Sequence, residues 1–79
     1  MNLPTDSAHN PYQEVPLDQN QKVRLTLIAT GWAGDPSIRI QIRDETGHLR
    51  PGPEIPTAQL SQIAVALIAL LSHQPQAKT

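Results

Sequence analysis

Two stretches with one apolar face at a strict period of two constrain the fold of this 79-residue chain more than any other feature. Every second residue is apolar from Val23 to Ala29 and again from Ile38 to Ile42. A period of two is typical of a strand with one buried face. Residues 31–36, between the two stretches, contain the glycines and the proline that a chain reversal needs. The sequence therefore predicts an antiparallel hairpin.

The register of this hairpin is expected to pair Thr30 with Ser37, which places Arg24 opposite Arg43. The same register makes two further pairs, Thr26 with Gln41 and Lys22 with Glu45. The acidic residues of the region are all expected in turns: Asp35, Asp44, Glu45 and Glu54. Like charges directly opposite each other destabilise a strand pair. An Arg24–Arg43 pair without a counter-charge would therefore indicate an anionic partner such as phosphate.

Residues 1–20 contain three prolines among polar residues and show no apolar periodicity. We expect this stretch to be a flexible N-terminal arm. The alternative is an edge strand that docks through Tyr12, Val15 and Leu17, because an edge strand tolerates proline. Residues 21–74 are expected to form a single small domain, since so short a chain supports only one core. Residues 75–79 are expected to form a C-terminal tail.

The second half of the chain predicts one helix. His48–Arg50 can add a short third strand before the prolines at 51, 53 and 56 end any pairing. Thr57 is a suitable N-cap for a helix that runs from Ala58 to about Ser72. A two-stranded sheet alone is marginal in water, so the helix should cover the isoleucine face of the hairpin. The expected fold class is α+β: a small antiparallel hairpin or three-stranded sheet followed by one C-terminal helix, with a flexible N-terminal arm.

The expected helix carries more apolar surface than one small sheet needs. Its apolar stripe consists of Leu60, Ile63, Ala64, Leu67, Ile68, Leu70 and Leu71. The opposite side has no charge, and the whole segment from Ile55 to Ala77 lacks Asp, Glu, Lys and Arg. This pattern favours an interface with a second copy or another protein, formed by Gln62, Val65, Ala66 and Ala69.

Two other interpretations of this helix stay open. A small helix can simply have an uncharged back that faces water. A membrane anchor is the third interpretation, although the apolar run Ile63–Leu71 is only about half of the ~20 residues that a span requires. The expected partner is thus a second copy or another protein, with no membrane involved.

No motif for catalysis, a metal or a cofactor is present. The chain has no cysteine, and its three histidines have no metal-ligand spacing. Its serines lie in no nucleophile motif, and there is no phosphate-binding glycine loop. We expect no catalytic residues, no metal and no cofactor, and hence not an enzyme. The N-terminus lacks a basic region followed by an apolar core, so a cytoplasmic location is expected.

The outer face of the hairpin gives an alternative function. Four basic residues are expected on this face: Lys22, Arg24, Arg39 and Arg43. With Trp32 in the hairpin loop as an aromatic platform, they could bind nucleic acid. Arginines on an exposed strand are also ordinary, solvated residues that discourage edge pairing. The net charge of -1 and the aromatic content of 3% favour assembly over nucleic-acid binding.

Part of the chain also resembles a known family. Its segments Ile40–Arg43, Asp44–Gly47, Arg50–Gly52, and Pro56–Thr57 with Leu60 are similar to the end of the positive cofactor four transcriptional coactivators, over about Ile38 to Leu67. The resemblance implies a homodimer of curved antiparallel sheets, with helices at the interface, that binds single-stranded nucleic acid. It also implies that Arg50 joins Arg39 and Arg43 as a basic contact.

Two functions are therefore expected from different classes. The first is a non-catalytic interaction protein that self-associates or docks on a partner through its charge-free C-terminal helix. The alternative is a single-stranded nucleic-acid-binding module, similar to a transcriptional coactivator, that uses the basic sheet face.

Overall fold

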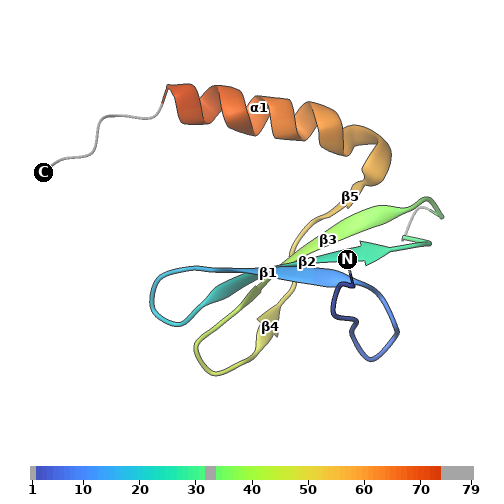
Figure 1. The fold of residues 1–79 in the computed structure, drawn as a ribbon, viewed down its shortest axis with the longest axis vertical. Helices are drawn as coiled ribbons and strands as arrows, with labels where there is room; N and C mark the ends of the chain where they lie inside the picture. The colour runs from blue at the N-terminus through green and yellow to red at the C-terminus, as the bar shows by residue number, and fades with distance from the viewer. Residues whose placement is uncertain (1, 32–33, 74–79) are drawn as a thin grey trace, which may run out of the picture.

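The fold is an antiparallel sheet of five strands followed by a single helix (Figure 1), as seen in a computed structural model that describes residues 2–31 and 34–73. In chain order the elements are β1 (Tyr12–Pro16), β2 (Lys22–Ile28), β3 (Ser37–Arg43), β4 (Leu49–Arg50), β5 (Glu54–Pro56), the short 3₁₀ helix η1 (Thr57–Gln59) and α1 (Leu60–Ser72). The predicted α+β class is confirmed, and the sheet has more strands than the two or three expected.

The central hairpin of β2 and β3 is confirmed, but its register differs from the expected one by two residues. Ile28, not Thr30, lies opposite Ser37. The connecting loop is longer than expected because the Gly31 amide donates a 2.8 Å hydrogen bond to the Asp35 carbonyl and closes a turn within the loop. A shift by two residues leaves every side chain on its predicted face, because the side-chain period of a strand is two.

The change of register separates the two arginines that were expected to face each other. Arg24 lies opposite Gln41, and Lys22, not Arg24, lies opposite Arg43. The predicted pairing of Lys22 with Glu45 is wrong for the same reason. Apolar residues still pair with apolar residues on the other face, where Leu25 lies opposite Ile40 and Leu27 opposite Ile38.

Residues 12–16, part of the expected flexible arm, form the edge strand β1, as in the alternative interpretation. This strand runs antiparallel to β2 and places Glu14 opposite Arg24. The residues before it form a loop, which is closed by a bridge between Thr5 and Pro11 and by a 3.0 Å hydrogen bond from the Tyr12 amide to the Pro4 carbonyl.

Strand β3 has two partners on its other edge. Its end pairs with β4, and its beginning pairs with β5, where Pro56 lies opposite Ser37. The prediction that the prolines end all pairing is therefore wrong. A proline is accepted here because β5 is at an edge of the sheet, where a strand needs fewer amide donors. Between β4 and β5 the backbone of Gly52 passes so close to the Ile40 carbonyl that a Cβ atom would collide with it.

The helix does not cover the sheet as predicted. Figure 1 shows α1 extending away from the end of β5, and none of its thirteen residues is buried. The chain passes from β5, which ends at Pro56, through η1 into α1 without an intervening loop. Thr57 begins η1 and makes no capping hydrogen bond, because the N-cap positions are Pro56 for η1 and Gln59 for α1.

As a result, the apolar face of the sheet is the more open of its two faces. The three buried side chains of the described residues, Thr26, Ile28 and Ser37, lie on the opposite, polar face. On the apolar face Leu27 is 40% exposed.

Candidate functional site

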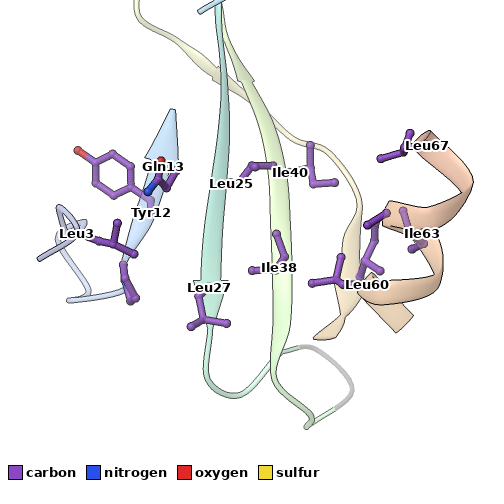
Figure 2. A pocket seen from close by; sticks show the side chains of 13 residues that line it. Leu3, Tyr12, Gln13, Leu25, Leu27, Ile38, Ile40, Leu60, Ile63 and Leu67 are labelled. Carbon is purple, nitrogen blue, oxygen red and sulfur yellow. The ribbon is translucent and has the colours of Figure 1, made fainter. Parts of the chain in front are cut away.

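A cavity of about 500 Å³ lies between the apolar face of the sheet and the first two turns of α1 (Figure 2). The sheet contributes Leu25, Leu27, Ile38, Ile40 and Ile55 to its lining. The helix contributes Leu60, Ile63, Ala64 and Leu67, and the N-terminal part of the chain contributes Leu3, Pro11, Tyr12 and Gln13. We call this cavity the docking groove. None of its lining residues is charged, so it suits an apolar occupant.

Figure 2 shows how the docking groove is built. Ile38 and Ile40 point from β3 toward the helix, while Ile63 and Leu67 approach from the opposite wall. The alternating pattern of β3 and the i, i+4 spacing on α1 produce these two walls. The sequence correctly predicted both apolar surfaces. The prediction that they pack closely is wrong, because a cavity lies between them.

Most of the large apolar side chains of α1 are exposed. Its exposed large side chains are Val65, Leu67, Ile68, Leu70 and Leu71, each between 57% and 69% exposed. The four residues predicted as an interface, Gln62, Val65, Ala66 and Ala69, are all exposed as well. These four residues are thus accessible, and the exposed apolar surface of α1 extends beyond them. Ile68, Leu70 and Leu71 were assigned to sheet packing and are instead part of the exposed surface.

The opposite face of the sheet contains an ion-pair network around Glu14. Arg24 donates a 2.9 Å hydrogen bond from Nε to Glu14 Oε2, and its Nη2 forms an ion pair with the same oxygen, also at 2.9 Å. Arg43 donates from Nε to the same oxygen at 3.2 Å, and Lys22 Nζ lies 4.0 Å from Oε1. The prediction of an Arg24–Arg43 pair without a counter-charge is therefore wrong. Glu14 was missed because its position opposite Arg24 depends on the docking of β1.

A second acidic residue on this face is Glu54, which lies in β5 and not in a turn as predicted. Its Oε2 accepts hydrogen bonds from Arg39 Nε at 3.3 Å and Nη2 at 3.2 Å. Its Oε1 accepts a 2.9 Å hydrogen bond from Ser37 Oγ. Arg39 thus shares its charge with a carboxylate, although its side chain is still 42% exposed.

The predicted nucleic-acid contacts are brought together only in part. Lys22, Arg24, Arg39 and Arg43 do share one face of the sheet. Arg50 lies opposite Ile42 and so is assigned by register to the other face, with its Nε 3.7 Å from Asp44 Oδ2. Trp32 lies outside the described residues. Tyr12 is the aromatic residue that joins the face, with the Arg24 guanidinium 4.0 Å from the centre of its ring.

The pKa of Glu14 reflects two opposing effects. Burial alone would raise the pKa of this carboxyl. The hydrogen bonds and positive charges of Arg24 and Arg43 outweigh burial, so the pKa of Glu14 lies below its ordinary value of 4.5. The group is therefore ionised at neutral pH and neutralises part of the basic face.

Asp44 shapes the turn between β3 and β4. Its Oδ1 accepts hydrogen bonds from Thr46 Oγ1 at 2.6 Å, and from the Thr46 and His48 amides at 3.0 Å. The Thr46 hydroxyl, together with these amides, lowers the pKa of Asp44. The predicted turn role of Asp44 is confirmed.

The described residues offer no metal site and no membrane-spanning helix. They contain no group of three or more His, Cys, Asp or Glu side chains that could hold a metal ion. His9, His48 and His73 are all exposed. No helix within residues 2–31 and 34–73 has both the length and the apolar character needed to cross a membrane.

Comparisons with known proteins return no similar protein. Neither a protein-family model, nor a curated protein, nor a solved structure matches the chain.

Proposed function

We propose that the chain is a non-catalytic interaction protein that docks on another protein surface through α1 and the docking groove. The observation that carries this proposal is the exposure of five large apolar side chains on a helix that has no charged residue. Covering each such side chain stabilises a complex by up to ~1.5–3 kcal/mol. Large exposed apolar patches on soluble proteins mark interaction sites.

The charge distribution supports the same function. All described charged residues lie between positions 6 and 54, before the start of η1, while the docking groove and α1 carry none. A partner can therefore cover this surface without removing any ion of the chain from water, a cost that buried charges otherwise impose.

The absence of cysteine from the chain allows a direct test. Leu71→Cys places one thiol on the exposed apolar stripe of α1, and Glu45→Cys places one in an exposed turn as a matched control. The alkylation rate of each thiol is measured in intact cells and divided by its rate in the unfolded chain. We expect the thiol at position 71 to react several-fold more slowly than the control. Equal normalised rates would show that α1 is not covered, and the proposed function would be wrong.

A second candidate function is binding of single-stranded nucleic acid by the polar sheet face. Two observations favour it. The four basic residues on that face outnumber its two carboxylates, Glu14 and Glu54, and the side chain of Lys22 is 51% exposed. The resemblance to the positive cofactor four coactivators points the same way.

Fluorescence anisotropy with a labelled oligonucleotide at two salt concentrations tests this second candidate. Binding that weakens with salt and is reduced by Lys22→Glu would support it, because phosphate contacts release counterions. Lys22 is chosen for this test because replacing Arg24 or Arg43 would also remove a hydrogen bond to Glu14 and so disturb the sheet. No binding at low salt would exclude this function.

A further inference from the structure

We infer that the docking groove binds a free fatty acid, with the aliphatic chain between the sheet and α1 and the carboxylate beside Arg50. The inference goes beyond the proposed function. A protein partner would cover the exposed second half of α1, whose Ile68, Leu70 and Leu71 line no wall of the groove. The fatty acid would fill the groove itself. Three observations support it: the shape of the groove, its few polar groups, and one cation on the apolar face.

The docking groove has a floor and two walls, so it can surround a narrow ligand (Figure 2). The floor is the central hairpin, with Leu25, Leu27, Ile38 and Ile40. The N-terminal segment with Leu3 lies on one side of this floor, and α1 with Ile63 lies on the other. The volume of about 500 Å³ is within the ~300–1,000 Å³ that small-molecule sites have.

The size and the lining of the groove decide between its possible occupants. Two turns of a partner helix with side chains have a volume on the order of 1,000 Å³, so a helix could cover the groove but not enter it. An extended peptide is narrower, but its amide and carbonyl groups need hydrogen-bond partners. Of the described lining residues only Tyr12 and Gln13 are polar, and the Tyr12 ring contacts Arg24. An aliphatic chain brings no polar group and needs no such partner.

Arg50 places a positive charge where a chain in the groove would end. Among the residues of the five described strands, it is the one charged side chain that register assigns to the apolar face. It lies opposite Ile42, which is about 7 Å along β3 from Ile40 in the groove floor. Its side chain is 69% exposed, and its Nε lies 3.7 Å from Asp44 Oδ2, which is longer than a hydrogen bond. The guanidinium therefore has donors for a ligand carboxylate.

The first experiment measures binding of laurate to the purified full-length chain by isothermal titration calorimetry, below the concentration at which laurate forms micelles. We expect saturable binding of one laurate per chain. Arg50→Gln should weaken laurate binding roughly two- to five-fold, the range of an exposed ion pair, and leave binding of the uncharged dodecanol unchanged. The matched control is Lys22→Gln, which removes the same charge from the polar face and should change neither affinity.

A second pair of variants tests whether the groove holds the chain. Ala64 is an exposed residue of α1 that lines the groove, so Ala64→Trp adds a large side chain to the cavity without removing a buried contact. We expect it to abolish saturable laurate binding. Ala66→Trp adds the same side chain to an exposed position outside the groove lining and should leave the affinity unchanged. Circular dichroism checks that both variants fold.

A third measurement needs no variant. Methyl-labelled isoleucines are followed by NMR while laurate is added to the wild-type chain. The signals of Ile38, Ile40 and Ile63, which line the groove, should shift in proportion to saturation. The signal of Ile28 should stay in place, because this side chain is buried on the polar face. The signal of Ile68 should also stay, because it lines no wall of the groove.

Each other outcome contradicts the inference. No saturable laurate binding would overturn it. Binding that shifts Ile68 and not Ile38, and that Ala64→Trp leaves unchanged, would show adsorption to the exposed half of α1. An equal loss of laurate and dodecanol binding in Arg50→Gln would overturn the placement of the carboxylate. These measurements use the purified chain, so their result is independent of the thiol at position 71, whose protection in cells tests the proposed function.

Discussion

Arg24 of β2 donates a 2.9 Å hydrogen bond from its Nε to Glu14 Oε2 on the neighbouring edge strand β1. The same carboxylate oxygen accepts a hydrogen bond from Arg43 of β3. One acidic side chain thus links three adjacent strands across the polar face of the sheet. The linkage explains how a strand bounded by Pro11 and Pro16 is held at the edge.

The first prediction concerns this linkage. Glu14→Gln should lower the free energy of unfolding by about 1–2 kcal/mol, because it removes the counter-charge of two partly buried arginines. The change is measured by urea denaturation, which leaves ion pairs unscreened. Glu45→Gln removes a charge from an exposed turn and should have little effect. Equal effects of the two variants would contradict the structural role of Glu14.

The second prediction concerns pH. The pKa of Glu14 is lowered in the folded chain, so the folded state holds this proton less strongly than the unfolded state. The stability from Glu14 is therefore fully present above its ordinary pKa of 4.5 and is lost as pH falls through the lower folded value. Unfolding midpoints of the wild-type and Glu14→Gln chains should differ at pH ~7 and converge in acid. A constant difference at all pH values would contradict this assignment.

The third prediction concerns the close approach of Gly52 to the Ile40 carbonyl. Gly52→Ala should lower the free energy of unfolding by about 1–3 kcal/mol, since its Cβ atom would force β3 and the connection between β4 and β5 apart. Thermal unfolding measures the loss. Glu45→Ala, at an exposed turn position, is the control. A Gly52→Ala chain as stable as the wild type would show that the connection has room to move.

The fourth prediction concerns the turn after β3. Gly47 has a φ of 89°, in the left-handed region that most side chains avoid. Gly47→Val should therefore cost about 1–2 kcal/mol in unfolding free energy. Gly47→Asn should cost clearly less, because asparagine tolerates positive φ. Comparison of the two variants by urea denaturation checks the prediction, and equal losses would mean that φ is not the cause.

The sequence could predict the hairpin and its two faces because alternation is a local property. It could not predict the register, which depends on how the loop closes through Gly31 and Asp35. The ion pairs of Glu14 and Glu54 could not be predicted, since they require β1 and β5 to pair with the edges of the hairpin, and both are short strands that end in a proline. The exposed apolar helix could be recognised from composition, but its direction depends on the direct junction with β5.

The exposed apolar side chains of α1 have a consequence for the stability of the folded chain. A single copy leaves the apolar side of α1 in water, and an assembly that covers it stabilises the folded state by mass action. Under the proposed function, the folded fraction then rises with the concentration of the partner. Under the same proposal, a copy without its partner is the one most exposed to proteolysis and aggregation.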